Sequence, residues 1–380
     1  MKAAAFFIFG VLYVVNHINA EGFYNIAHMT NNKPAVKWAM ENGANAVEVD
    51  LQFKTDGTPY EFFHVNPCDC SCMCAEGGCN IAFPNSVCAQ LEKTSTRPCD
   101  AKTEVKELLR YIAGQRKMVM VMIDSKLTDQ SKNMNAATQR RAAREVLRLL
   151  DSELFGRGFR GEVIVGAPGF DSMPYITEIS KTNSRHRSKI HFTIDMETLA
   201  DTKNKLNTLS NKNVVYNKGL TACSPTSPVT KYQSRIAAMN KHAGVFGMTY
   251  TWSVDRSDTL EWYSNYFNGI ITNYPGSLAK IVKDKNIRLA THSDKIPAAT
   301  SSTPLTNTDN YESCNCDYYS GGCKIEKAAP RGYACQCTYE GAWTCHGWVV
   351  LCSDKDSSKC RNPDKSIESC REGRGDCGAY

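Results

Sequence analysis

Short runs of strand-like alternation between apolar and polar residues are separated along this chain by stretches with helical periodicity. Strands are predicted near residues 24–28, 46–51, 118–124, 162–166, 189–194, 213–216, 246–252 and 269–272. Helices are predicted between them at 34–41, 104–113, 136–154, 197–209 and 229–242. Residues 118–123 are continuously apolar, as in a parallel strand buried on both faces. The pattern predicts an α/β fold, a (β/α)₈ TIM barrel.

One segment departs from the alternation of strands and helices. Residues 53–64 contain Asp56-Gly57, a dipeptide typical of a two-residue hairpin turn. A parallel strand would need a crossover of a dozen or more residues, which this distance does not provide. Residues 60–63 are therefore predicted to pair antiparallel with an extension of the second strand. That pairing folds His64 back towards the carboxyl end of the second strand.

Polar side chains recur where the predicted strands end, and TIM-barrel active sites form at the carboxyl ends of strands. Glu48 and Asp50 are two residues apart, so both point to one side of their strand. Two converging carboxylates predict half of a divalent-metal site, with a pair of solvated acids as the alternative. The other strand-end residues are His28, Asp124, Lys126, Tyr250, Trp252, Asp255 and Asn273.

The first twenty residues are predicted to be a signal peptide. Lys2 is followed by an apolar run over residues 6–15, and Ala20 offers a small residue for cleavage. The run is too short to span a bilayer, which needs about 20 residues. We therefore expect a secreted, extracellular protein. Its formal net charge of +6 suits approach to anionic membrane surfaces but is far from a nucleic-acid footprint.

The 18 cysteines fall into two groups and indicate an oxidising compartment. Eight lie between Cys68 and Cys223, and ten between Cys314 and Cys377, so each group can close on its own. In the cluster that begins at Cys68, successive cysteines are separated by a single residue, whereas zinc sites usually show Cys-X₂₋₄-Cys pairs. Export also favours disulfides, which we expect there.

Between the two cysteine groups, residues 297–310 are rich in Ser, Thr, Ala and Asn and are predicted to be a linker. The predicted organisation is a barrel over 21–296 and a small disulfide-rich module over 311–380. A module of this size has a thin core, so disulfides must supply much of its stability.

Six motifs in chain order resemble one known family. They are His28-Met29 with Asn31; Gly43-Ala44-Asn45 to Glu48-X-Asp50; His64 followed by Pro67-Cys68-Asp69-Cys70; Ile123-Asp124-Ser125-Lys126; Tyr250-Thr251-Trp252-Ser253-Val254-Asp255; and Ile271-Thr272-Asn273-Tyr274-Pro275. Together they resemble the dermonecrotic-toxin phospholipase D family of spider venoms, the sphingomyelinase D toxins. That family belongs to the wider glycerophosphodiester phosphodiesterase barrels.

The resemblance implies a Mg²⁺-dependent enzyme acting on choline- or ethanolamine-headed sphingolipids and lysolipids. In such an enzyme the metal would be held by Glu48, Asp50 and Asp124. His28 and His64 would be the acid–base pair, with Lys126 on the phosphate. The disulfides implied are Cys68–Cys74 and Cys70–Cys223. The family's reaction releases the head-group alcohol and forms a cyclic phosphate.

The chemistry of these residues agrees with that expectation. A few hard oxygen ligands suit Mg²⁺ better than zinc. Of two histidines beside a phosphodiester, one can take a proton from the nucleophile while the other gives a proton to the leaving group. Tyr250 and Trp252 offer aromatic faces to a quaternary ammonium, with Asp255 or Asp69 as countercharge. Asn273 is predicted to donate or accept a hydrogen bond in the site. The expected partner is a phospholipid at a membrane surface, bound by a monomer that does not span the bilayer.

Two alternatives remain open at this level. One is a glycerophosphodiester phosphodiesterase that uses water on small diesters, and the other is a secreted binding protein on a catalytically retired barrel. Residues 289–296 stand where the spider toxins have a closing segment with Asn, Pro and Trp, none of which occurs here. Closure of the barrel base is therefore an open question.

Overall fold

The computed structural model describes residues 21–64, 102–127, 134–195, 199–219, 234 and 237–300, and the backbone of six short strands between 313 and 368. The chain divides into two compact units, and the larger one contains the barrel. The predicted signal peptide and all eight cysteines of the first group lie outside the described residues. In the described parts, no helix has both the length and the apolar character that a membrane crossing requires.

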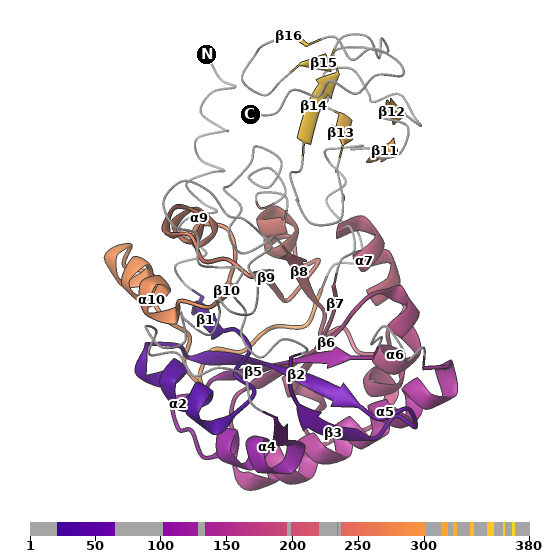
Figure 1. The fold of residues 1–380 in the computed structure, drawn as a ribbon, viewed down its shortest axis with the longest axis vertical. Helices are drawn as coiled ribbons and strands as arrows, with labels where there is room; N and C mark the ends of the chain where they lie inside the picture. The colour runs from indigo at the N-terminus through magenta and orange to yellow at the C-terminus, as the bar shows by residue number, and fades with distance from the viewer. Residues whose placement is uncertain are drawn as a thin grey trace, which may run out of the picture. The chain divides into compact units, whose positions relative to one another are not determined.

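Eight parallel strands form a barrel that is nearly closed (Figure 1). In spatial order they are β1 (Tyr24–Ala27), β2 (Ala46–Phe53), β5 (Met120–Lys126), β6 (Glu162–Ala167), β7 (Ile190–Ile194), β8 (Val215–Gly219), β9 (Met248–Trp252) and β10 (Gly269–Thr272), which returns to β1. Between β7 and β8 the pairing narrows to one parallel bridge, Phe192–Val214. The predicted strands are confirmed to within a few residues, because burial on both faces leaves a clear apolar signature.

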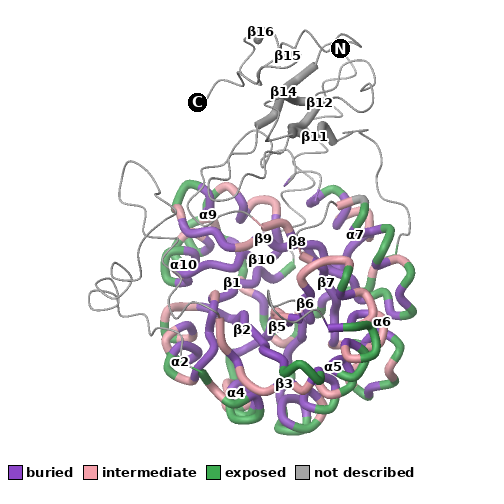
Figure 2. The backbone as a smooth tube through the Cα atoms, turned by 45° about the vertical axis from the view of Figure 1, so that its right-hand side comes forward, coloured by how far each residue is buried: buried purple, intermediate pink, exposed green. Residues whose placement is uncertain are grey.

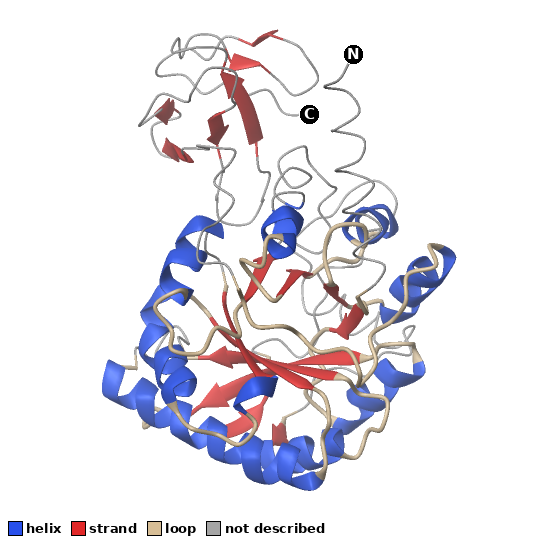
Figure 3. Cartoon of the chain, turned by 180° about the vertical axis from the view of Figure 1, so that it is seen from behind, coloured by secondary structure: helices blue, strands red, loops and turns tan. Residues whose placement is uncertain are grey.

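Helices surround the strands (Figure 3). They are α2 (Lys33–Glu41), α4 (Val105–Ala113), α5 (Ala136–Leu149), α6 (Met173–Lys181), α7 (Leu199–Leu206), α9 (Ser257–Tyr263) and α10 (Pro275–Asp284). In α4, Val105, Leu108, Leu109 and Ile112 are buried against the barrel, a spacing that places them on one face. The sequence pattern did not predict α6, α9 and α10.

The barrel strands are buried along most of their length (Figure 2), and successive side chains join two different cores. On β2, Val47, Val49 and Leu51 join the core between strands and helices. Ala46 belongs to the cluster inside the barrel, on the same side of the strand as Glu48 and Asp50. The interior is therefore apolar towards the amino ends of the strands and carries carboxylates towards their carboxyl ends.

The predicted hairpin is confirmed. β3 (Pro59–Phe62) runs antiparallel to β2 with Phe62 opposite Leu51, and β4 (Thr103–Glu104) pairs with β3. β1 pairs with β2 only as far as Val47, so the outer part of the same β2 edge is available to β3. The strand therefore returns over the end of β1 and delivers His64 there.

The base of the barrel is closed by residues 289–300. Ala290 and Ile296 pack in the interior cluster, and Ala290 donates its N–H to the carbonyl of Phe23 at 2.8 Å. Lys295 forms an ion pair of 3.2 Å with Glu162, at the start of β6. Residues 289–296 thus take part in closing the base without an Asn, Pro or Trp, since the small and aliphatic side chains of Ala290 and Ile296 fill the interior layer.

The last part of the base segment overlaps the predicted linker. Ala299 and Thr300 donate backbone hydrogen bonds to Lys212 and Gly244 at 2.8 Å each. Residues 301–312 lie outside the described residues. The linker and the boundaries of the predicted module therefore stay predictions.

The smaller unit contains a six-stranded sheet. Its strands are β11 (Ser313–Asp317), β12 (Gly322–Lys324), β13 (Cys335–Cys337), β14 (Trp348–Cys352), β15 (Cys360–Arg361) and β16 (Ile367–Glu368). They occur in the order β12-β11-β13-β14-β15-β16. Cysteine pairing in this unit lies outside the described residues, so the disulfide framework stays a prediction.

Candidate active site

Three carboxylates from two neighbouring strands converge at the carboxyl end of the barrel. Glu48, Asp50 and Asp124 each offer an oxygen, and these oxygens lie within 4.8 Å of one another. The parallel register of β2 and β5 places Asp50 directly beside Asp124. Three hard oxygen donors without thiolate or imidazole fit a hard divalent cation. The predicted ligand set is thus brought together by strand register.

Lys126 lies against this cluster. Its ammonium forms ion pairs with Asp50 Oδ1 at 2.8 Å and with Asp124. Burial by itself would lower the pKa of Lys126, but Asp124, Asp50 and Glu48 outweigh burial and raise that pKa well above its ordinary value. The lysine therefore stays charged and supplies a fixed positive charge beside the carboxylates.

The two buried carboxylates of β2 respond to the site in opposite ways. Burial, followed by repulsion from Asp50, raises the pKa of Glu48 well above its ordinary value. Burial by itself would also raise the pKa of Asp50, but Lys126, His64 and a hydrogen bond from Asn31 outweigh it and lower that pKa to about 2. The pair thus favours one proton on Glu48 while Asp50 is ionised.

The segment after β1 is fastened to the carboxylates of β2. Asn31 donates through Nδ2 to Asp50 Oδ2 and accepts from the Asp50 N–H, both at 2.7 Å. Met29 donates its N–H to Glu48 Oε2 at 2.7 Å. Met29 does so with φ +50°, a left-handed conformation that costs on the order of 1 kcal/mol in a non-glycine residue. The His28-Met29-X-Asn31 motif therefore sets the orientation of both carboxylates.

The two predicted acid–base residues face each other across the barrel end. His28 follows β1, His64 follows β3, and their ring centroids lie 6.4 Å apart with the rings inclined at 70°. The hairpin accounts for the approach, because the Phe63 N–H donates to the carbonyl of Asp50 at 2.9 Å. His64 is thereby placed near enough to Asp50 to lower its pKa.

A chain of hydrogen bonds fixes His28. The carboxylate of Asp255 can only accept, and it receives Nδ2 of Asn273 at 2.9 Å and the Asn273 N–H at 2.7 Å. The amide oxygen of Asn273 therefore faces His28 Nδ1 at 3.1 Å. An amide oxygen only accepts, so this contact assigns the proton of neutral His28 to Nδ1 and the lone pair to Nε2.

The predicted aromatic residues occupy different environments. Tyr250 is fully buried in the barrel interior, so its ring presents no exposed face. Trp252 is half-buried and donates its indole N–H to Asn217 Oδ1 at 2.7 Å. A Cβ on Gly219 would lie 2.4 Å from the indole ring, so the glycine lets the ring lie against β8. Of the two predicted aromatic residues, Trp252 is therefore the one whose ring can contact a ligand.

Asp195, which the sequence pattern did not single out, lies just after β7 on the inner side of the barrel. Burial, followed by repulsion from Asp124, raises its pKa to about 8. Its Oδ1 is enclosed without a hydrogen-bond partner among the residues that the structure describes. The position was detectable in principle as another acid at a strand end, but no neighbouring motif marked it.

Asp255 was predicted to be a countercharge for the head group. In the structure its carboxylate instead accepts hydrogen bonds from Thr272 and Asn273. Asp69 and the cysteines of the two implied disulfides lie outside the described residues: Cys68, Cys74, Cys70 and Cys223. Their roles stay predictions.

Comparison with known proteins decides the family. The sequence model described as "Dermonecrotic toxin SPH" matches residues 19–296. The chain belongs to the dermonecrotic toxin family. Among related dermonecrotic toxins, LarSicTox-betaID1 of Loxosceles arizonica is 25% identical over 288 residues, covering 71% of this chain and 91% of the relative. StSicTox-betaIB1i of Sicarius terrosus is 22% identical, covering 71% and 96%.

The barrel of this family member also resembles solved structures. A putative glycerophosphoryl diester phosphodiesterase from Silicibacter pomeroyi matches with a TM-score of 0.51 and 12% identity, covering 71% of this chain and 96% of that one. At such low identity the likeness shows the fold alone. Membership of the dermonecrotic toxin family supports an enzyme of phosphodiesterase type.

Proposed function

We propose that this chain is a Mg²⁺-dependent phosphorus–oxygen lyase of phospholipase D type. It would release the head-group alcohol from sphingolipids and lysolipids and leave a cyclic phosphate. The observation that carries the proposal is the assembly of two facing histidines, three carboxylates and Lys126 at one end of the barrel. A retired binding protein would have little physical reason to hold these charges together.

His28 and His64 would divide the proton transfers. With its proton on Nδ1, His28 offers Nε2 to take the proton of the substrate hydroxyl. That oxygen bonds to phosphorus, the bond from phosphorus to the head-group oxygen breaks, and His64 gives the leaving oxygen a proton. Attack by a hydroxyl of the same molecule benefits from proximity and needs no activated water.

The carboxylate cluster and Lys126 would stabilise the phosphoryl group. Mg²⁺ held by Glu48, Asp50 and Asp124 would act as a Lewis acid on the phosphoryl oxygens. Lys126 would contact the same oxygens, since its ammonium is fixed beside Asp50 by a 2.8 Å ion pair. Asn31 would keep the Asp50 carboxylate oriented through its 2.7 Å bond.

The far side of the barrel mouth would bind the head group. Trp252 is oriented by Asn217 and presents a ring for a cationic ammonium. Asp195 would supply the countercharge, because a nearby cation favours its ionised form and lowers its raised pKa. The substrate would be reached at a membrane surface by a peripheral, monomeric protein. The toxin relatives support the secretion of this protein.

Phosphorus NMR tests the proposal directly. Purified protein would be incubated with sphingomyelin, ceramide phosphoethanolamine or lysophosphatidylcholine, with Mg²⁺ or with EDTA. We expect a cyclic phosphate signal that EDTA and His28→Ala abolish, while the control His292→Ala, at a half-buried position in the base segment, keeps it. A linear monoester would indicate the hydrolytic alternative, and absence of turnover on every diester would favour the binding protein.

A further inference from the structure

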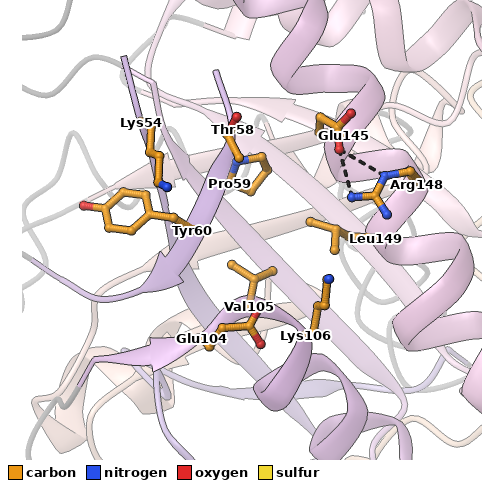
Figure 4. A pocket seen from close by; sticks show the side chains of 10 residues that line it. All are labelled: Lys54, Thr58, Pro59, Tyr60, Glu104, Val105, Lys106, Glu145, Arg148 and Leu149. Carbon is orange, nitrogen blue, oxygen red and sulfur yellow. Dashed lines mark hydrogen bonds and ion pairs between the residues drawn. The ribbon is translucent and has the colours of Figure 1, made fainter. Parts of the chain in front are cut away.

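A hollow lies on the flank of the barrel, beneath the β2–β3 hairpin and between α4 and α5 (Figure 4). Its volume is about 300 Å³, at the lower end of the range of small-molecule pockets. Its apolar lining is buried and consists of Pro59, Val105 and Leu149. The carboxylate cluster of the active site does not line it.

Two lysines extend into this hollow from opposite sides. Figure 4 shows Lys54 on the hairpin side and Lys106 on the α4 side, both with the ammonium turned towards the space between them. Neither ammonium forms an ion pair or a side-chain hydrogen bond with any residue in the described part of the chain. Like charges that converge without a counterion raise the local positive potential. The hollow is therefore a place where an anion lowers the electrostatic energy.

The acids around the hollow neutralise these lysines only in part. Hydrogen bonds from Thr58 lower the pKa of the Asp56 carboxylate, and the attraction of Lys54 lowers that pKa further. Glu145 pairs with Arg148 at 2.9 Å on α5. The Glu104 carboxylate accepts the N–H of Glu107 at 2.9 Å and so caps α4. Asp56, at the hairpin tip, pairs with Arg141 at 3.4 Å. The lining keeps a net positive charge, because Lys54, Lys106 and Arg148 outnumber Glu104 and Glu145.

We propose that this hollow is a binding site for a phosphate group, separate from the catalytic centre. Lys54 and Lys106 would contact the phosphoryl oxygens as point charges, and the apolar lining would receive a short apolar part of the ligand. The group can come from an anionic lipid head group or from a free phosphate. The ligand would join the hairpin to α4, and the same hairpin delivers His64 to the active site.

The test compares two double variants in the full chain. Lys54→Gln/Lys106→Gln removes the two ammoniums, and Lys117→Gln/Lys283→Gln removes the same charge from exposed positions outside the hollow. One probe is inorganic phosphate, followed by calorimetry. The other is phosphatidylcholine vesicles containing phosphatidylglycerol, followed by co-sedimentation. Both are measured in EDTA without turnover, so the result does not depend on the lyase proposal.

We expect the pocket variant to bind vesicles roughly thirtyfold more weakly, because each lysine near an anionic surface contributes about 1 kcal/mol. If the pocket variant binds both vesicles and phosphate more weakly, the hollow is a general phosphate site. If only vesicle binding weakens, the hollow is a site for a lipid head group. Loss of phosphate binding alone would indicate a soluble ligand. Equal losses in both double variants, or none, would overturn the proposal.

Hydrogen exchange locates the ligand. The Lys54 N–H bonds to the Thr58 carbonyl and the Gly57 N–H to the Lys54 carbonyl, each at 2.9 Å. Phosphate bound beneath the hairpin should slow exchange of these two amides in the wild-type chain and not in Lys54→Gln/Lys106→Gln. Unchanged exchange at saturating phosphate would place the bound anion elsewhere and contradict the proposal.

Discussion

At the scale of single residues, Glu48 links metal binding to pH. Its pKa is raised by burial and by Asp50, so below that pKa a cation must displace a proton. We expect Mg²⁺ affinity to rise with pH and binding to release protons. Calorimetry in two buffers of different ionisation enthalpy measures the release. Glu48→Gln should bind Mg²⁺ at least tenfold more weakly, and an unchanged affinity would remove Glu48 from the ligand set.

Asp195 gives a second pH effect, on stability. The unfolded chain ionises an aspartate near pH 4, whereas the folded protein holds this proton up to about pH 8. Between these values the folded state binds more protons, so the free energy of unfolding falls as pH rises from about 4 to about 8. Urea unfolding in EDTA at several pH values measures the slope. Asp195→Asn should flatten it, and an equal slope in the variant would assign the effect to other groups.

At the scale of elements, the β2–β3 hairpin depends on Gly57. Its φ is +85°, and a Cβ there would lie 2.7 Å from the carbonyl oxygen of Thr138. Gly57→Ala should therefore lower the free energy of unfolding by about 2 kcal/mol or more, from backbone strain plus the clash. Activity should fall as well, because a displaced hairpin moves His64.

Gly158 provides a matched control for that substitution. Its φ is +96°, and nothing lies within 4 Å of a Cβ built on it. Gly158→Ala should cost only the strain, roughly 1 kcal/mol, and leave activity unchanged. Chemical denaturation and steady-state kinetics of both variants make the comparison. Equal effects on activity would show that the hairpin position does not matter for catalysis.

At the scale of the whole molecule, closure of the barrel base supports the active site at the other end. Ile296 is 5% exposed and fills the interior layer at the base. Ile296→Ala should lower the free energy of unfolding by about 2–4 kcal/mol through the cavity it leaves. Met239→Ala, at a position 37% exposed, is the control and should change stability little. A negligible cost at Ile296 would mean that this segment packs loosely.

The sequence alone determined the strands, the hairpin and the principal charged residues. Strand burial follows from local alternation, so β2 and β5 were found with their carboxylates on the correct face. The hairpin followed from chain length and an Asp-Gly turn, and these two features also implied that His64 returns to the strand ends. Short helices such as α9 were missed, because seven residues carry little periodicity.

The tertiary structure decided which strand ends become neighbours, and with that the roles that depend on neighbours. Asp255 proved to orient Asn273, and through it His28, because closure of the barrel places β10 beside β1. Asp195 acquired its raised pKa only from enclosure and from Asp124 across the barrel. Tyr250 and Trp252 belong to one strand, yet Tyr250 is buried inside the barrel and Trp252 is only half-buried. Protonation and accessibility depend on the three-dimensional surroundings, which local sequence does not contain.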